Sequence, residues 1–117
     1  MTFAFTRNPI QIVYKDETGP KDTYGGNVGI IALTGTHFKP EQASDTILVT
    51  MHPIGGTAAL PVMRIFAESG VHVLACDSRY RGADYALIMD RVALDLGAAV
   101  RCAKERLGYA RVILLGW

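Results

Sequence analysis

Apolar and polar residues alternate along the first part of the chain, a pattern typical of β-strands. Residues 9–14 alternate as a half-exposed strand does, and residues 27–33, which are apolar and rich in β-branched side chains, predict a second strand. The Gly-rich turn between the two segments favours an antiparallel hairpin. Two polar stretches that contain Gly or Pro, residues 16–27 and 34–45, are predicted to be loops, and the second holds His37.

Three later segments are short apolar runs bounded by turn residues. They are residues 46–51, 71–76 and 111–115. Runs of this kind are typical of strands that are buried on both faces of a parallel sheet. The sequence therefore predicts three buried parallel strands after the hairpin.

Helical periodicity fills the intervals between these runs. A first helix is predicted to begin near Thr57, which can cap it, to hold Pro61 in its first turn and to end at Gly70. A longer helix is predicted over about residues 84–107, where apolar residues recur at steps of three and four, with Asp84 as its N-cap. The order strand, strand, strand, helix, strand, helix, strand predicts an α/β fold with an antiparallel start and right-handed parallel crossovers.

Composition narrows the class of protein. The 117 residues are 50% hydrophobic and 20% charged, which indicates one globular domain or part of one. Twelve basic and eleven acidic residues give a formal charge of +1, which is no electrostatic reason to expect nucleic acid or an anionic membrane. No apolar run approaches the ~20 residues of a spanning helix, and residues 1–11 hold no secretory signal. We therefore expect a cytoplasmic protein with no nucleic-acid or membrane partner.

Side chains that bind metals or cofactors do not form a known motif here. The three histidines lack the short spacing of a helical zinc motif. Residues 25–29 are Gly-rich but precede a predicted strand, whereas a dinucleotide fingerprint follows one. Cys76 and Cys102 are expected to be buried packing residues in a reducing compartment. We therefore predict no metal and no cofactor.

Three motifs follow the three buried runs in turn. The first is His52-Pro53-Ile54-Gly55-Gly56, the second is Asp-Ser-Arg-Tyr-Arg-Gly-Ala-Asp at residues 77–84, and the third is Gly116-Trp117. In order and spacing these motifs, within residues 46–117, resemble the α/β-hydrolase family. They match that family's His-Gly oxyanion loop, its Asp-x-Arg-Gly-x-Gly-x-Ser/Asp turn (here with an inserted Tyr80-Arg81) and the first two positions of its nucleophile elbow, Gly-x-Ser-x-Gly.

The resemblance implies a role for each residue of the first motif. Negative charge builds on a carbonyl oxygen during acyl transfer, and backbone N–H groups stabilise it. Pro53 has no N–H, so the family pattern favours Ile54 as the donor, with Gly55 as the alternative. Gly55 and Gly56 would let the backbone approach the substrate. We expect His52 to order the loop through hydrogen bonds rather than to act as the catalytic base.

The second and third motifs carry different expectations. Asp77, Arg79 and Asp84 are interpreted as turn-capping and ion-pairing residues rather than as an acid–base cluster. Gly116 and Trp117 would begin the nucleophile elbow. By the resemblance, the nucleophilic serine would be the residue that follows Trp117, and it is not in this sequence.

On this resemblance, residues 1–117 are the N-terminal portion of one α/β-hydrolase domain and form the first half of its mostly parallel sheet. The implied function is that of a serine hydrolase or acyltransferase with a small-molecule acyl substrate. A complementary C-terminal polypeptide would carry the serine, an Asp or Glu, and a His, so we expect the chain alone to be inactive. The boundary after Trp117 has three interpretations: processing such as self-cleavage, an end of the written sequence only, or a free-standing fragment.

Two other functions are compatible with the residues. A hydrolase-like half-fold without chemistry would serve as a binding or scaffold module. A small nucleotide-binding domain of the flavodoxin type is the third hypothesis, although a phosphate-loop signature is missing. The sequence that follows Trp117 distinguishes them, because only the enzyme requires a serine, an acid and a histidine there.

Overall fold

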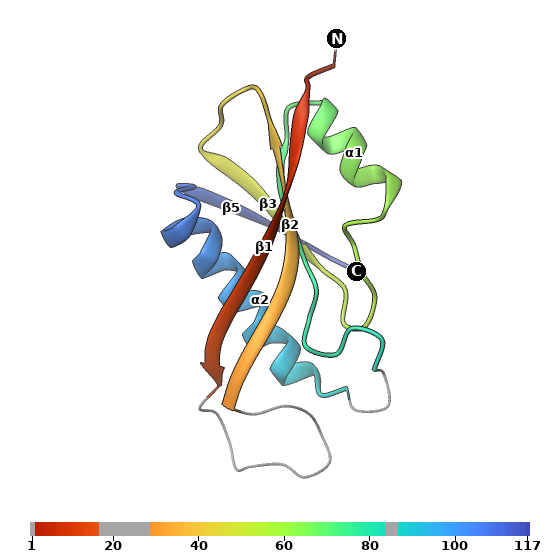
Figure 1. The fold of residues 1–117 in the computed structure, drawn as a ribbon, viewed down its shortest axis with the longest axis vertical. Helices are drawn as coiled ribbons and strands as arrows, with labels where there is room; N and C mark the ends of the chain where they lie inside the picture. Colours follow the sequence, from red (N-terminus) through yellow and green to blue (C-terminus); the bar gives the residue numbers. More distant parts are fainter. Residues whose placement is uncertain (1, 17–28, 84–86) are drawn as a thin grey trace.

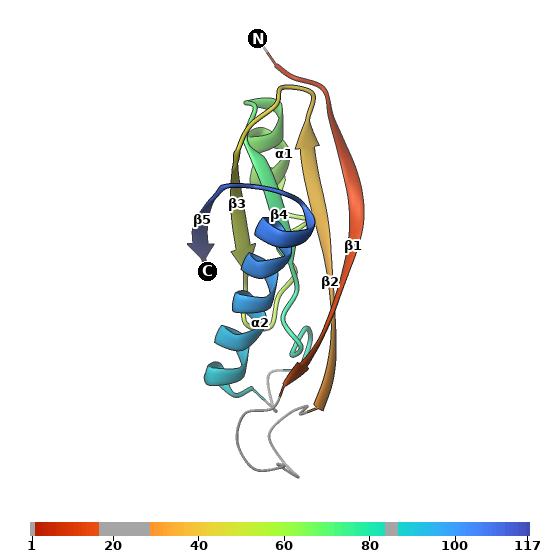
Figure 2. The ribbon, with the colours of Figure 1, turned by 90° about the vertical axis from the view of Figure 1, so that its left-hand side faces the viewer.

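Five strands form one mixed sheet that two helices cover (Figures 1 and 2). The computed structural model describes residues 2–16, 29–83 and 87–117. The strands pair in the order β1-β2-β4-β3-β5. Their bounds are Phe5–Asp16 (β1), Gly29–Pro40 (β2), Thr46–Met51 (β3), His72–Cys76 (β4) and Arg111–Gly116 (β5). The architecture confirms the predicted α/β class.

The N-terminal hairpin is antiparallel, as predicted, but longer than the sequence pattern indicates. β1 and β2 pair over their full lengths, and β2 also pairs antiparallel with β4 on its other edge. The loop predicted from residue 34 is therefore wrong for residues 34–40, which continue the strand. A Cβ at Gly35 would lie 2.9 Å from the backbone oxygen of Ala75, so glycine is required at this position, where β2 pairs closely with β4. Residues 27 and 28, the predicted start of this strand, lie outside the described residues.

The strands β4, β3 and β5 are parallel, as predicted. Every residue of β4 and most of β3 are buried. From β3 the chain connects to β4 on one side, and from β4 it crosses back to β5 on the other side of β3. In α/β sheets, ligands bind outside the carboxyl ends of the strands where the chain changes direction in this way. The carboxyl end of β3 is therefore the expected position of a site.

The two helices lie on opposite faces of the sheet, one in front of it and one behind it in the view of Figure 2. α1 (Pro61–Glu68) packs on the face that holds Val73, and α2 (Met89–Arg101) packs on the face that holds Leu74. Val73 and Leu74 are consecutive in β4, so their side chains point to opposite faces. The core is therefore divided into two apolar layers with the parallel strands between them.

The helix boundaries differ from the predicted ones. α1 begins four residues after Thr57, which makes no capping hydrogen bond, but Gly70 ends the helix as predicted with a φ of +91°. α2 begins at Met89 rather than near residue 84, and the predicted cap Asp84 lies outside the described residues. The last turn of this segment, Cys102–Arg106, is a π-helix that the sequence did not predict.

β5 is an exposed edge strand, whereas the sequence predicted a buried one. Among the described strands it pairs with β3 alone. The side chains of Ile113 and Leu114 are 56% and 55% exposed. These two residues are consecutive, so their side chains point to opposite faces of the sheet. Val112 packs against the core, but most residues of β5 are exposed within the part of the chain that the structure describes, so the prediction of a buried strand is wrong there.

A chain of buried polar side chains joins β2, β4 and the segment before β5. His37 lies in β2 and is buried, so the polar loop predicted for it is wrong. The Tyr109 hydroxyl lies 2.7 Å from His37 Nε2 and 2.6 Å from His72 Nδ1, and His72 Nε2 lies 2.7 Å from the carbonyl oxygen of Gln42. The carbonyl only accepts, so His72 Nε2 donates to it. With both rings neutral, Tyr109 donates to His72 and accepts from His37, which satisfies all three side chains.

This arrangement predicts a loss of stability on acidification. Burial first, and then the proximity of His72 and Lys39, lower the pKa of His37 from 6.5 to about 4. Between these pH values the unfolded chain binds a proton that the folded one does not, so the free energy of unfolding falls as the pH falls from about 6.5 to about 4. The expected contribution is about 2–3 kcal/mol. Urea unfolding of the protein across this range of pH measures this contribution.

His37→Gln is the matched variant for this measurement. Its amide keeps a donor for Tyr109 but does not titrate. The variant is expected to lose less stability than the wild type between pH 6.5 and 4. Equal pH dependence of the two proteins would contradict the assignment of a neutral, buried His37.

Candidate active site at the carboxyl ends of the parallel strands

The three sequence motifs meet at one edge of the sheet. Residues 52–56 follow β3 directly, and residues 77–82 follow β4. β5 runs parallel to β3 with Gly116 opposite Met51, so the end of β5 lies beside the start of the loop at 52–56. This edge is the one at which ligands bind in α/β folds. Side chains that are distant in sequence are thus brought together at the predicted position.

His52 organises the loop after β3. Its Nδ1 accepts hydrogen bonds from the backbone N–H groups of Ile54, at 3.1 Å, and Gly55, at 2.8 Å. A ring nitrogen that accepts carries no proton, so a neutral His52 ring holds its proton on Nε2. The two N–H groups that the sequence proposed as alternative oxyanion donors converge on one point, and the His52 nitrogen occupies it.

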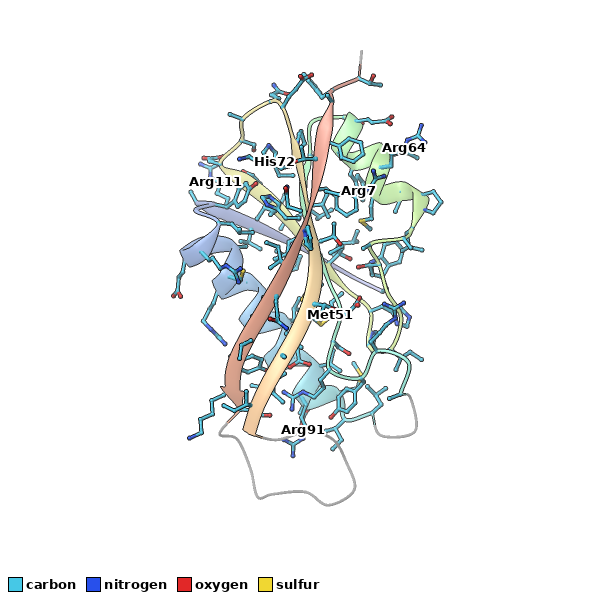
Figure 3. The ribbon with its side chains drawn as sticks, in the orientation of Figure 1. Arg7, Met51, Arg64, His72, Arg91 and Arg111 are labelled. Atoms are coloured by element: carbon cyan, nitrogen blue, oxygen red, sulfur yellow. The ribbon has the colours of Figure 1, made fainter. Side chains whose placement is uncertain are left out.

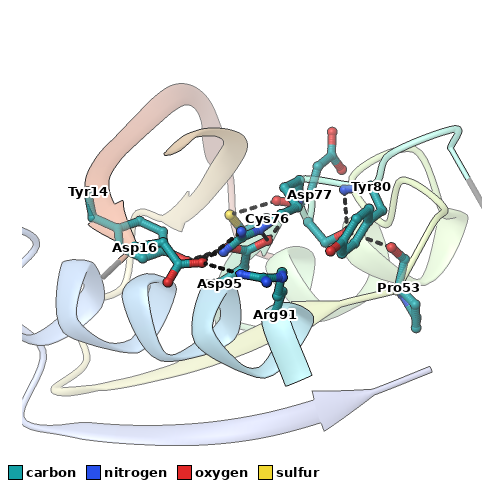
Figure 4. A network of polar contacts seen from close by, with 10 residues as sticks. Tyr14, Asp16, Pro53, Cys76, Asp77, Tyr80, Arg91 and Asp95 are labelled. Carbon is teal, nitrogen blue, oxygen red and sulfur yellow. Dashed lines mark hydrogen bonds and ion pairs between the residues drawn. The ribbon is translucent and has the colours of Figure 1, made fainter. Parts of the chain in front are cut away.

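Hydrogen bonds hold this loop against the turn after β4. The Ser78 hydroxyl donates to the carbonyl of Pro53 at 2.5 Å, and the backbone N–H of Gly82 donates to the carbonyl of Ile54 at 2.8 Å. The backbone N–H of Tyr80 donates to the same Ser78 hydroxyl at 3.0 Å (Figure 4). These bonds fix the loop before a substrate binds, which is what electrostatic preorganisation requires.

A hydrogen bond between two side chains joins the residue after β5 to β3. The Trp117 indole N–H donates to the Thr50 hydroxyl at 2.5 Å. Thr50 is fully buried, whereas Trp117 is 51% exposed. The sheet pairing and this bond together hold Gly116 and Trp117 beside the loop at 52–56.

A hollow of about 220 Å³ opens beside the loop. Most of the lining side chains are small, and they belong to Thr34, Gly35, Thr36, Gly56, Ala58, Ala59, Ala75, Asp77 and Arg81. The cation among them, Arg81, pairs with Asp77, with 3.0 Å between Arg81 Nη1 and Asp77 Oδ2. The Arg81 side chain is 56% exposed, so its charge remains accessible to a ligand.

A buried ion network supports the turn after β4 (Figure 4). The guanidinium of Arg79, 1% exposed, lies 2.9 Å from Asp16 Oδ2 and 2.9 Å from Asp95 Oδ1. The backbone N–H of Arg79 also donates to Asp95, at 2.8 Å, and the Tyr14 hydroxyl donates to Asp95 at 2.5 Å. Arg91 adds a second cation 3.4 Å from Asp16. The network therefore ties β1, the turn and α2 together.

The sequence predicted ion pairs at Asp77 and Arg79, and both occur. It missed the partners of Arg79, because Asp16 lies 63 positions and Asp95 16 positions away. A local signal for Asp95 was present: it follows Val92 by three residues and so shares the apolar face of α2. An acidic residue on the apolar face of a helix indicates a buried polar partner. No comparable signal marks Asp16.

The two cysteines are free and buried, as predicted. Burial first, and then the charge of Asp77, raise the pKa of the Cys76 thiol to about 12, and burial also raises the pKa of Cys102. Both thiols therefore stay protonated near neutral pH and are poor nucleophiles. Burial and the hydrogen bond to Asp95 likewise raise the pKa of the Tyr14 hydroxyl.

In residues 2–16, 29–83 and 87–117, no group of three or more His, Cys, Asp and Glu side chains is placed to hold a metal ion. No helix within these ranges has the length and apolar character to cross a membrane.

Figure 3 shows His72 and Arg91 toward opposite ends of the molecule, so the buried histidine chain and the Arg79 network are separate clusters.

Comparison with known proteins gives a likeness of fold. No protein-family model and no curated protein matches the chain. Among solved structures, an esterase of Pyrococcus furiosus matches 97% of this chain with a TM-score of 0.63 and 21% sequence identity. The matched region is 41% of the length of that esterase chain. The chain therefore shares its α/β fold with part of that esterase, and it spans less than half of the esterase's length.

Proposed function

We propose that the chain is the N-terminal portion of a serine hydrolase of the α/β-hydrolase type, which hydrolyses or transfers the acyl group of a small molecule. The observation that carries the proposal is the convergence of the Ile54 and Gly55 N–H groups on one point at the carboxyl end of β3. The likeness of the fold to an esterase supports the same class of enzyme. Residues 1–117 then belong to one domain, which a C-terminal part completes.

Within this proposal the nucleophile is a serine directly after Trp117. Gly116 lies opposite Met51, so a residue in that position would emerge beside the loop at 52–56. The serine hydroxyl attacks the acyl carbon of the substrate, and the C-terminal part supplies the histidine that takes its proton and the Asp or Glu that orients this histidine. The bond from the acyl carbon to the leaving alcohol or amine then breaks, and the histidine returns the proton to this leaving group. Water or an acceptor, activated by the same histidine, releases the acyl group from the serine. The chain alone has no complete set of these groups and is inactive.

The oxyanion forms where the two N–H groups converge. Attack on the acyl carbon moves negative charge onto the carbonyl oxygen, and the N–H of Ile54, or that of Gly55, donates to it. The imidazole of His52 holds this position in the structure. The ring therefore turns away when the substrate carbonyl enters, and the carbonyl oxygen replaces His52 Nδ1 as the acceptor of the donating N–H group.

The exposed β5 supports the continuation of the sheet. Its outer edge has no strand partner among the described residues, and Ile113 and Leu114 expose apolar surface on both faces. Such an edge is an aggregation hazard unless it is covered. We propose that the C-terminal part adds a strand to this edge and helices to its faces.

Labelling of the complete protein with a fluorophosphonate tests the proposed nucleophile. The reagent is expected to modify one serine, the residue that follows Trp117, and peptide mapping by mass spectrometry locates it. Replacement of that serine by alanine is expected to lower ester hydrolysis by about 10⁴-fold or more. A label on another residue, or a folded protein that does not react, contradicts the proposal.

The same sample shows how the C-terminal part is supplied. In denaturing mass spectrometry, a 12.7 kDa species beside a second polypeptide indicates cleavage before the serine. A single larger species indicates one continuous chain.

A non-catalytic binding or scaffold module is the alternative function. One observation favours it, because both candidate oxyanion donors already have an acceptor in His52. A complete, folded protein with neither fluorophosphonate labelling nor esterase activity would support this alternative.

A further inference from the structure

The hollow beside the candidate oxyanion loop holds a cation that the proposed chemistry does not use. We propose that Arg81 binds a carboxylate of the substrate, so that the preferred substrates are acyl compounds with an anionic group close to the bond that is cleaved. The inference deepens the proposed hydrolase function and rests on it for the reaction. The carboxylate site itself rests on the geometry around Arg81.

Arg81 is held by one edge of its guanidinium. Its Nη1 lies 3.0 Å from Asp77 Oδ2, and Asp77 is fixed in turn by Thr34, which accepts from the Asp77 backbone N–H at 2.8 Å and donates to Oδ2 at 3.4 Å. A guanidinium has five N–H donors in a fixed plane. The remaining donors of Arg81 have no acceptor within the described residues. The pair with Asp77 therefore orients the side chain without using up its hydrogen-bonding capacity.

The guanidinium lies directly against the oxyanion loop. A Cβ at Gly56 would be 2.4 Å from Arg81 Nη1 and 2.6 Å from Arg81 Cζ, so the charged group fills the space that a side chain would need. Gly56 is the neighbour in sequence of Gly55, whose N–H is one of the two converging donors. A ligand bound to Arg81 is thus one residue away from the point where the oxyanion is proposed to form.

The volume and lining of the hollow suit a short polar substituent of a substrate. Its volume of about 220 Å³ is below that of a site for a whole drug-sized ligand, which is roughly 300–1,000 Å³. Its walls include the hydroxyl-bearing Thr34 and Thr36 and three alanines. A planar carboxylate on a short alkyl chain matches this lining, since a guanidinium binds carboxylates in a bidentate, coplanar manner.

The two arginines of the same turn differ in a way that supports this role. The donors of Arg79 are directed at the buried carboxylates of Asp16 and Asp95, and its side chain is 1% exposed. Arg81, two residues later, is 56% exposed and faces the hollow. Arg79 therefore stabilises the turn, and Arg81 is left to meet a ligand.

Steady-state kinetics of the complete protein with a matched pair of esters tests the inference. The pair is p-nitrophenyl valerate, which is neutral, and mono-p-nitrophenyl adipate, which carries a carboxylate. Arg81→Met is expected to lower kcat/KM for the adipate ester by about 10–100-fold and for the valerate ester by less than about 3-fold, since a hydrogen bond to a charged group has this strength. Arg81→Lys, which keeps the charge but not the planar fork, is expected to lie between the wild type and Arg81→Met for the adipate ester.

Arg64→Met is the matched control. Arg64 pairs with Glu68 on α1 and is 67% exposed, so the substitution changes the net charge by the same amount at a distant position. It is expected to leave the ratio of the two kcat/KM values unchanged. An equal change of this ratio in Arg64→Met and Arg81→Met would mean that overall charge sets the preference, and would overturn the inference.

Calorimetric binding of free adipate separates this inference from the proposed function. Adipate is expected to bind the wild type and to bind Arg81→Met at least 10-fold more weakly. Arg81-dependent binding in a protein that hydrolyses neither ester would support the carboxylate site and defeat the hydrolase. Hydrolysis of both esters with no dependence on Arg81, or the absence of Arg81-dependent adipate binding, would overturn the carboxylate site.

Discussion

Replacement of Asp95 by alanine is expected to lower the free energy of unfolding by about 3–5 kcal/mol, the usual cost of removing one partner of a buried ion pair. Asp95 is fully buried and accepts from the guanidinium and backbone of Arg79 and from the Tyr14 hydroxyl. Its loss leaves a 1% exposed cation with one carboxylate fewer and removes an acceptor from four donors, the Tyr14 hydroxyl and the backbone N–H, Nε and Nη2 of Arg79. Urea unfolding of the complete protein measures the change. Asp95→Asn keeps the shape of the side chain, and its free energy of unfolding is expected to lie between those of the wild type and Asp95→Ala.

The pair between Arg64 and Glu68 provides the control for this experiment. Its 2.7 Å separation is as short as that of the buried pair, but the Arg64 side chain is 67% exposed. Solvent screening limits such a pair to about 0–1 kcal/mol. Glu68→Ala is therefore expected to have a small effect. If Asp95→Ala and Glu68→Ala lowered the free energy of unfolding by similar amounts, burial would not explain the contribution of the Arg79 network to stability.

The position of the network links stability to the site. Arg79 belongs to the turn whose Ser78 and Gly82 hold the loop at 52–56. Asp95 is on α2 and Asp16 is at the end of β1, so two separate segments fix this one turn. Loss of the network is therefore expected to loosen the loop as well as the fold.

The parallel strands were predictable because their signal is local. An apolar run between two turn residues shows that a strand is buried whatever its neighbours are, and β3 begins and ends where residues 46–51 predicted. The exposure of β5 does not follow from a local signal of this kind. Its sequence is that of a buried strand, and its surroundings depend on which elements lie next to it.

The wrong predictions for residues 34–40 of β2 and for His37 have a different cause. Gly35, His37 and Pro40 resemble loop residues when only their neighbours in sequence are considered. In the fold, Gly35 allows the close approach of β4, and His37 is satisfied by Tyr109, 72 residues away. Long-range partners of this kind override local propensity, and a single sequence does not reveal them.

In the candidate site, too, some features could be predicted from the sequence and others depend on long-range contacts. The meeting of residues 52–56 with Gly116 could be predicted, because parallel neighbouring strands end at one edge of a sheet. The contact between Arg81 and Gly56 could not, because it depends on how the turn after β4 folds back over the loop. The acceptor role of His52 was expected in kind, but not the fact that it engages both candidate donors.

On the proposed function, Gly55→Val is expected to lower the turnover of the complete protein by about 10²-fold, the scale of losing one oxyanion donor. A Cβ at Gly55 would lie 3.1 Å from His52 Nδ1 and 3.4 Å from its Cγ. The branches of valine add to this crowding, so the ring and the loop have to shift and the N–H groups of Ile54 and Gly55 no longer converge. Gly55 is not among the described glycines with a positive φ, so the effect comes from this contact and not from backbone strain.

Gly97→Ala distinguishes this local effect from a general cost of replacing glycine. Gly97 lies within α2, and a Cβ there would meet Arg101 Nη1 at an ordinary 3.6 Å. Alanine favours a helix over glycine by up to about 1 kcal/mol, so this variant is expected to keep full turnover and to unfold at higher urea. Gly55→Ala, with one methyl group, is expected to lie between Gly55→Val and the wild type in turnover. A folded Gly55→Val protein with unchanged turnover would contradict the oxyanion role of this loop, because the convergence of its two N–H groups could then be lost without consequence for the chemistry.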